Sequence, residues 1–161
     1  AVAWCRENLR GGSFSAVDLL PPTSFPDGHF SLAIGYSVMS HLPPEVQREW
    51  LQEMRRIVAP GGLFLASVHG PFAARFAYPT STPARRFAWS RRQPVQDFLK
   101  AGFWDGGDDH ALDGVAPAGY YRGAFQTPDW TRREWSKYFR ILEIREGGMQ
   151  NYQDLVIMER V

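Results

Sequence analysis

A strand–helix–strand pattern over residues 30–69 is the feature that most constrains the fold of this chain. Two short apolar runs, 30–36 and 63–68, flank it, and neither shows the polar alternation of a sheet with one wet face. Both are therefore predicted to be strands buried on both faces. The segment between them begins with Pro43–Pro44 and ends before Pro60–Gly62, as a helix start and stop would. Two parallel strands joined by a helix form a crossover unit, so the pattern predicts an α/β fold.

The predicted helix between these strands has one apolar face, on which residues recur at spacings of three and four. Its members are Val46, Trp50, Met54, Ile57 and Val58. Ligands of open parallel sheets bind beyond the carboxyl ends of the strands. Polar residues that follow 30–36 and 63–68 are therefore the first candidates for a functional site.

The remaining segments add elements around this unit. Residues 1–9 are predicted to form a helix, 13–20 a third strand, and 127–137 another helix. Residues 139–146 and 154–161 are predicted to form an antiparallel pair across a glycine-containing turn. The second of that pair lacks alternation and is placed inside the sheet, whereas the first carries several charges and is placed at an edge.

Residues 70–123 show weak periodicity and are rich in Pro, Gly, Arg and aromatic residues. Inside them we expect a short helix over 94–101 and a loop at 106–110. So long a stretch with little regular structure is typical of a functional insertion such as a lid. We therefore treat residues 1–161 as a single domain with 70–123 as its insertion.

Composition excludes several classes of function. The 161 residues fit one domain, and a hydrophobic content of 44% excludes disorder. With 18 Lys and Arg against 17 Asp and Glu, the chain lacks the excess of basic residues that is typical of proteins that bind nucleic acids or anionic membranes. A single cysteine favours a reducing compartment, and we expect a cytoplasmic protein. The chain starts with Ala1 inside a helical pattern, so we expect it to be a fragment of a longer protein.

Four segments together resemble the class I S-adenosylmethionine-dependent methyltransferases. They are Asp18–Leu19, Phe25–Ala33, Ser37–Leu42 and Leu51–Leu63, the last ending in Pro-Gly-Gly. The resemblance implies a Rossmann-like sheet that is mostly parallel with a C-terminal antiparallel hairpin. It also implies truncation at the N-terminus, because the family's glycine-rich loop and ribose-binding acid would precede Ala1. Ser31 departs from the pattern, since the family usually has Asp at that position.

The resemblance assigns cofactor-binding roles to four residues. Asp18 would accept a hydrogen bond from the adenine amino group of S-adenosylmethionine, with the Leu19 backbone beside it. Tyr36 and Ser37 would line the methionine end of the cofactor. The alternatives are that Asp18 satisfies neighbouring N–H groups at a turn and that Ser37 caps a helix.

His41 and His69 are the candidate catalytic residues, because both follow the carboxyl end of a predicted strand. A neutral imidazole there could remove a proton from an acceptor hydroxyl as the methyl group arrives. The alternative for each is a packing or capping role. We expect no metal site, because Asp108–His110 in a glycine loop is better explained as a solvated turn.

Two further groups within the insertion are open to either explanation. Tyr120, Tyr121 and Arg122 could line an acceptor pocket or form a small core of the insertion itself. Arg85, Arg86, Arg91 and Arg92 could grip an anionic substrate group, but a solvated face explains them better.

The expected function is methyl transfer from S-adenosylmethionine to a small-molecule oxygen or nitrogen by the parent protein. We expect the chain as given to bind the cofactor weakly and to be inactive. One alternative is a non-catalytic methyltransferase-like module that serves dimerisation or partner binding, and another is a different doubly wound nucleotide-binding enzyme. The strand at 30–36 would have one side unpaired, so either 13–20 pairs with it or a second copy does, and we favour a homodimer.

Overall fold

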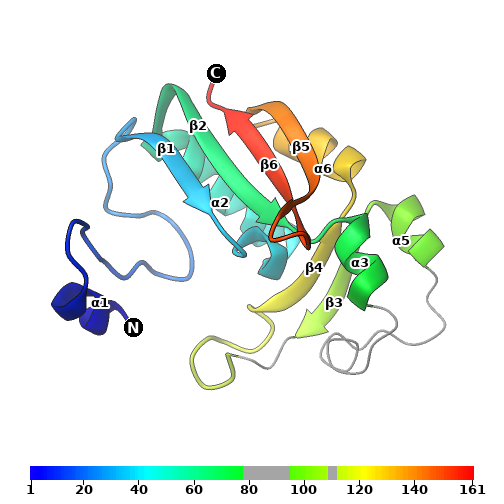
Figure 1. Cartoon of the computed structure of the whole chain (residues 1–161), viewed down its shortest axis with the longest axis horizontal. Coiled ribbons are helices and arrows are strands. Elements are labelled where there is room, and N and C mark those ends of the chain that lie inside the picture. The colour runs from blue at the N-terminus through cyan, green and yellow to red at the C-terminus, as the bar shows by residue number, and fades with distance from the viewer. Residues whose placement is uncertain (78–94, 109–111) are drawn as a thin grey trace.

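The computed structural model describes residues 1–77, 95–108 and 112–161 (Figure 1). The predicted arginine face of residues 85–92 and the predicted turn residues Asp109 and His110 lie outside the described residues. In chain order the elements are α1 (Val2–Asn8), β1 (Phe30–Gly35), the 3₁₀ helix η1 (Met39–His41), α2 (Pro44–Ile57), β2 (Val58–Val68), α3 (Pro71–Ala77), α5 (Val95–Ala101), β3 (Phe103–Asp108), β4 (Arg122–Gln126), α6 (Pro128–Trp135), β5 (Arg140–Met149) and β6 (Gln153–Glu159).

The main sheet has four strands in the order β1-β2-β6-β5. β1 pairs with β2 in parallel, whereas β2–β6 and β6–β5 are antiparallel. The predicted hairpin, with β6 inside the sheet and β5 at its edge, is confirmed. The prediction of a mostly parallel sheet is wrong, because β1 has no second parallel neighbour among the described residues.

Residues 13–20 form no strand, contrary to prediction, and nearly all of them are exposed. An apolar run becomes a strand only where a sheet edge supplies hydrogen-bond partners. Here the carbonyl of Leu19 instead accepts hydrogen bonds from Trp50 Nε1 and from the hydroxyl of Tyr120. The segment is thereby held against α2 and the loop before β4 as irregular chain.

Residues 21–29 are fastened to α2 by a charged network. Glu53 accepts hydrogen bonds from the backbone N and the hydroxyl of Thr23 at 2.7 and 2.5 Å. Arg56 donates to Glu53 at 2.8 Å and to Asp27 at 2.7 Å. The hydrogen bond from Arg56 is the main reason that the pKa of Glu53 falls to about 2, while burial opposes the shift. These bonds fix the entry into β1.

The crossover helix α2 forms as predicted, but its end and its buried face differ. It ends at Ile57, three residues before the Pro60–Gly62 stop, because the chain turns directly into β2. Its buried residues are Gln47, Leu51 and Ile57, together with Glu53, which is paired with Arg56. The predicted residues Val46, Trp50 and Met54 are partly buried and pack beside the core.

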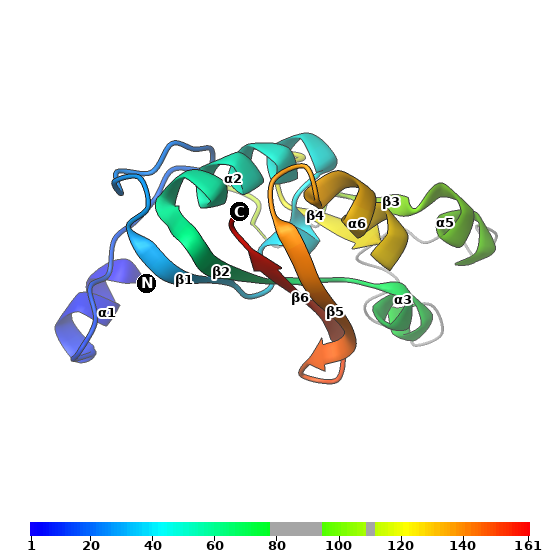
Figure 2. The same ribbon diagram turned by 90° about the horizontal axis from the view of Figure 1, so that it is seen from above.

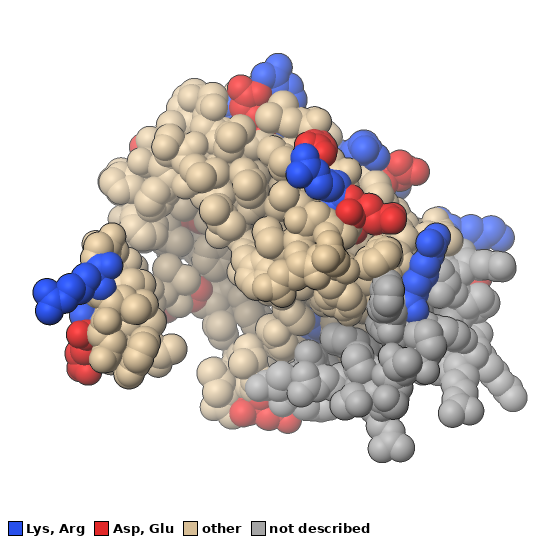
Figure 3. Space-filling view, in the orientation of Figure 1, with Lys and Arg blue, Asp and Glu red and all other residues tan. Residues whose placement is uncertain are grey.

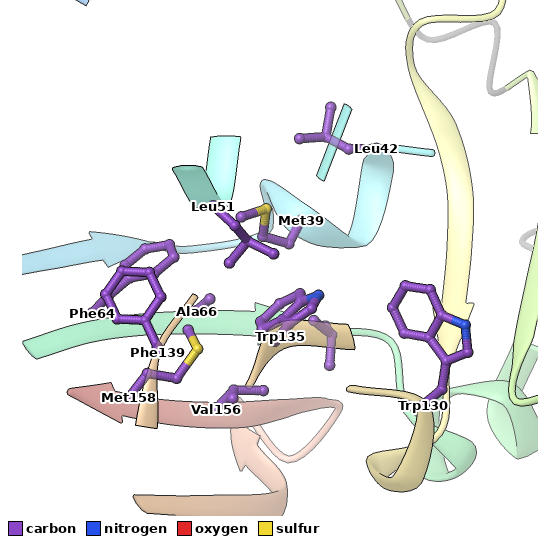
Figure 4. Close-up of a cluster of buried hydrophobic side chains, with 11 residues drawn as sticks. Met39, Leu42, Leu51, Phe64, Ala66, Trp130, Trp135, Phe139, Val156 and Met158 are labelled. Atoms are coloured by element: carbon purple, nitrogen blue, oxygen red, sulfur yellow. The ribbon is translucent and has the colours of Figure 1, made fainter. Parts of the chain in front are cut away.

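The core lies between one face of the sheet and the helices α2 and α6 (Figure 2). Side chains from the sheet, from α2 and from α6 meet there (Figure 4). Its largest fully buried members include Trp135, Phe139, Met39, Leu51 and Met158. Thr127 caps α6 by accepting a hydrogen bond from Trp130 N at 3.2 Å, which sets the helix against the sheet.

The opposite face of the sheet is open. Leu32 and Ile34 on β1 are 48% and 63% exposed, so the prediction that this strand is buried on both faces is wrong. No helix of the described part of the chain covers this face in Figure 2. Figure 3 shows that its middle carries uncharged side chains.

The segment 70–123 contains more regular structure than predicted. β3 and β4 pair antiparallel as a second, two-stranded sheet, and β3 includes the glycines that were predicted to form a loop. An isolated bridge between His69 and Phe125 joins β4 to the end of β2. Within the described residues, no helix is both long and apolar enough to cross a bilayer.

Candidate functional site

A cluster of polar side chains lies where β1 and β2 reach their carboxyl ends. Its members, which we call the strand-end cluster, are Ser37, His41, Ser67, His69 and Gln153. Ser37 and His69 follow the two strands, Ser67 lies within β2, and η1 carries His41. Gln153 enters from the first position of β6, which runs antiparallel to β2. The cluster brings together three predicted site residues, Ser37, His41 and His69.

Ser37 has a positive φ of 53°, which is uncommon for a residue with a Cβ. Its backbone N donates a hydrogen bond of 2.7 Å to Ser67 Oγ, which holds the turn against β2. Val38, not Ser37, is the N-cap of η1, and it makes no side-chain cap. The helix-cap alternative for Ser37 is therefore wrong, and strain at such a strand end is typical of functional sites.

Gln153 connects the members of the cluster. Ser67 Oγ donates to Gln153 Oε1 at 2.5 Å, and Gln153 Nε2 donates to Ser37 Oγ at 2.9 Å. Gln153 Nε2 also lies 3.3 Å from His69 Nε2. Ser67 and Gln153 are buried, so each of these bonds replaces one that water would otherwise make.

His69 is almost fully buried, with 3% of its surface exposed. Its ring stacks on Phe125 with centroids 4.9 Å apart and meets Tyr152 edge-on at 5.6 Å. The pKa of His69 is lowered to about 3, mainly by burial and also by the charge of His41, while a hydrogen bond with the Ala124 backbone opposes the shift. His69 is therefore neutral near pH 7, and a base with so low a pKa takes up a proton poorly.

His41 is held by hydrogen-bonding and stacking neighbours. Its Nδ1 lies 3.2 Å from the carbonyl oxygen of Arg122, its Nε2 lies 3.4 Å from Ser37 Oγ, and its ring stacks on Tyr121 with centroids 4.2 Å apart. A carbonyl only accepts hydrogen bonds, so Nδ1 carries the hydrogen and Nε2 presents its lone pair toward Ser37. His41 and His69 meet edge to face at 5.5 Å.

The other predicted cofactor residues lie outside these hydrogen bonds. Tyr36 follows β1 directly and is 47% exposed. Asp18 is an exposed residue of the irregular segment before β1, and Leu19 is anchored there through its carbonyl. The structure thus leaves the side chains of Asp18 and Tyr36 accessible.

Sequence reasoning missed Ser67 and Gln153. Both have a recognisable signal, because Ser67 is a polar residue within the apolar run Leu63–Val68 and Gln153 is one just before the apolar run Leu155–Met158. A buried polar residue in such a run needs a partner. The identity of that partner depends on the antiparallel pairing of β2 with β6, which one sequence does not reveal. Tyr121, predicted as either a pocket residue or part of a local core, contacts the cluster through His41.

No family model and no curated protein matches the chain. Solved structures do match it. The PH0226 protein from Pyrococcus horikoshii OT3 is 17% identical with a TM-score of 0.60, and the match covers 99% of this chain and 64% of that chain. A SAM-dependent methyltransferase from Methanosarcina mazei is 13% identical with a TM-score of 0.62, covering 100% of this chain and 77% of that one.

A third match is an S-adenosylmethionine-dependent methyltransferase from Mesorhizobium loti. It is 18% identical with a TM-score of 0.59, and the match covers 96% of this chain and 73% of that chain. The chain thus spans less than two thirds of the Pyrococcus protein and about three quarters of the other two. At these identities the matches show the fold.

Proposed function

We propose that this chain, which has the fold of the class I S-adenosylmethionine-dependent methyltransferases, belongs to an enzyme that methylates a small-molecule oxygen or nitrogen. The observation that carries the proposal is the strand-end cluster, in which Ser37 and His41 follow β1 and His69 follows the parallel strand β2. Ligands of open α/β sheets bind at this edge. The balanced charge of the chain fits a small-molecule partner, and its single cysteine supports a cytoplasmic location.

The residues that would hold S-adenosylmethionine in this chain are Asp18, Leu19, Tyr36 and Ser37. The accessible carboxylate of Asp18 suits an amino donor such as that of adenine, and half-exposed Tyr36 offers an apolar surface beside the strand end. Ser37 contributes the shape of the turn, because its N–H and hydroxyl are already engaged within the cluster. When bound, the cofactor supplies an electrophilic methyl group on a sulfonium sulfur.

The protein's own contribution to such a transfer is positioning of the acceptor and control of its proton. Tyr121 stacks on His41 from the segment that leads into β4, so part of 70–123 reaches the strand-end cluster. We propose that this insertion covers the acceptor and excludes water.

A second copy of the chain is the proposed macromolecular partner. β1 has one neighbour, β2, in the described sheet, and its exposed face carries Leu32 and Ile34. An apolar edge strand with an unpaired backbone is a template for another strand, and a two-fold dimer satisfies both copies equally.

Calorimetry with S-adenosylhomocysteine on the full-length gene product tests the proposed function. We expect Asp18→Ala to weaken binding about tenfold, the effect of losing one hydrogen bond to a carboxylate. Asp129→Ala is the matched control, because this exposed carboxylate lies on α6. Absence of binding by the full-length protein would overturn the proposal, and equal effects of the two variants would overturn the role of Asp18.

A further inference from the structure

The hydrogens of the strand-end cluster can be assigned one by one from the identity of each group. Ser37 N–H donates to Ser67 Oγ, so the hydroxyl hydrogen of Ser67 is available for Gln153 Oε1. That bond orients the amide, and the two hydrogens of Gln153 Nε2 then point to Ser37 Oγ and to His69 Nε2. His69 must accept at Nε2, which places its own hydrogen on Nδ1.

The hydrogen bonds extend from Ser37 to His41. Ser37 Oγ accepts from Gln153, so its hydroxyl hydrogen is directed to the remaining neighbour, His41 Nε2, at 3.4 Å. His41 Nδ1 donates to the Arg122 carbonyl at 3.2 Å. The donors of Ser37, Ser67, Gln153 and His41 in these bonds therefore each meet an acceptor.

The reversed amide orientation satisfies the cluster less well. It would place Gln153 Nε2 at Ser67 Oγ, and the hydroxyl hydrogen of Ser67 would lose Gln153 Oε1, its acceptor in the cluster. The hydroxyl hydrogen of Ser37 would then turn to Gln153 Oε1 and away from His41. Buried polar groups favour the arrangement that pairs more of them.

We propose that Ser37 and His41 form a proton relay for a hydroxyl acceptor, and that Gln153 is the positioning residue that sets its direction. This inference rests on the proposed methyl transfer and deepens it, because a hydroxyl needs a base whereas a neutral amine attacks with its own lone pair. Ser37 is the member open to the acceptor, since His41 is buried and Ser37 is partly exposed.

In the relay, one proton leaves the acceptor hydroxyl and one proton arrives at His41. The acceptor O–H bond breaks and its hydrogen bonds to Ser37 Oγ, while the hydroxyl hydrogen of Ser37 passes to His41 Nε2. The electron pair of the broken O–H bond stays on the acceptor oxygen and forms the bond to the sulfonium methyl carbon. The pair of the carbon–sulfur bond remains on sulfur, and His41 is left as an imidazolium with its Nδ1–H on the Arg122 carbonyl.

Histidine tautomers give a test that needs no enzymatic activity. Two-bond ¹H–¹⁵N correlation spectra of ¹⁵N-histidine protein at pH 7.5 are expected to show His41 and His69 both as Nδ1–H tautomers. In Gln153→Glu the new carboxylate only accepts, so His69 is expected to change to the Nε2–H tautomer. Gln52→Glu makes the same charge change at an exposed site of α2 and should leave both tautomers unchanged.

An Nε2–H tautomer of His69 in the natural protein, or no change in Gln153→Glu, would overturn the assignment. Gln153→Met provides a second variant if Gln153→Glu does not fold. It removes the donor without adding charge, and we expect the fixed Nδ1–H signal of His69 to give way to a tautomer mixture. Retention of a single Nδ1–H tautomer would overturn the role of Gln153.

Acceptor pairs test the relay itself. With phenol and aniline acceptors of one carbon skeleton, Ser37→Ala is expected to lower kcat about 100-fold more for the phenol than for the aniline, because only the phenol has a proton to relay. Ser40→Ala, in the same turn but outside the network, is the control. Equal losses on both acceptors would overturn the relay. No binding of S-adenosylhomocysteine by the natural protein would instead overturn the proposed function, whatever the tautomers are.

Discussion

The two faces of the four-stranded sheet both carry apolar side chains, but only one face is covered. Phe64, Val156 and Met158 are buried beneath α2 and α6. Leu32 and Ile34 point to the other side and remain about half or more exposed. The open face is uncharged in its middle, while charged side chains lie along its β5 edge (Figure 3).

The composition of a strand therefore predicts which of its side chains favour burial, but it does not predict which element covers them. A run without polar alternation predicts a strand covered on both sides. In this chain α2 and α6 cover one side, and the described part of the chain supplies no helix for the other. Large exposed apolar patches mark interaction surfaces, so the two faces should respond differently to the same substitutions.

The largest expected difference concerns Trp135 on the covered face. Trp135→Ala removes a side chain with no exposed surface and a hydrogen bond of 3.2 Å from its Nε1 to Gln47 Oε1. We expect the free energy of unfolding to fall by about 3–5 kcal/mol in urea denaturation. Leu142→Ala on the exposed part of β5 is the control, with an expected change within about 0.5 kcal/mol. Similar costs for the two variants would contradict the comparison.

Acid should lower the free energy of unfolding through His69, whose side chain is as buried as those of the core. Its folded pKa is lowered to about 3 from 6.5, so it stabilises the fold fully above pH 6.5 and loses that contribution as the pH falls toward 3. From this shift we expect a loss of about 3 kcal/mol by pH 4. The buried Asp154 makes a contribution to the pH dependence of stability with the opposite sign. Burial raises its pKa, so acid protonates it more readily in the folded state and thereby favours folding.

The measurement is urea denaturation at several pH values between 7 and 4. His69→Gln should flatten the slope of unfolding free energy against pH, whereas His29→Gln at an exposed position should keep it. An unchanged slope in His69→Gln would show that His69 is not held neutral by burial.

The fold was predictable where local and global signals agree. The crossover helix, the Thr127-capped helix and the terminal hairpin each combine a period with a stop or a turn, and the structure confirms them. The prediction of a strand over 13–20 was wrong because a strand needs a neighbouring strand, and the sequence of the run does not specify one. The prediction that β1 is buried on both faces was wrong for a similar reason, because the strand does not specify what covers it.

For the candidate site, the sequence predicted which residues follow the ends of strands. Position after a strand identified Ser37, His41 and His69, which the structure brings together. It did not identify Gln153, which reaches the cluster from β6, 84 residues after His69 in the chain. Nor did it reveal that burial holds His69 neutral, because burial depends on packing by Phe125 and Tyr152.

A charge on the open edge should separate two copies of the chain. Ile34→Lys places an ammonium on the exposed face of β1, and a lysine on an edge strand opposes edge-to-edge pairing. We expect the dimer dissociation constant in sedimentation equilibrium to rise about tenfold or more, or about 1.4 kcal/mol. Leu142→Lys makes the same change at the opposite edge strand, β5, and should leave association unchanged. A natural chain that stays monomeric at all accessible concentrations would contradict the proposed dimer.

The smallest expected effect is the loss of stability in Leu32→Ala, which should depend on protein concentration if the chain dimerises. Leu32 is 48% exposed, so Leu32→Ala should cost about 1 kcal/mol or less in a single chain, half of what full burial of a leucine contributes. If a second copy covers the remaining surface, the cost rises as the dimer forms, since the dimer is linked to folding by mass action. Urea denaturation at two concentrations a hundredfold apart measures the difference. Leu51→Ala, in the covered core, is the matched control, and its larger cost should be the same at both concentrations. A cost for Leu32→Ala that does not change with concentration would show that association leaves the open face exposed to water.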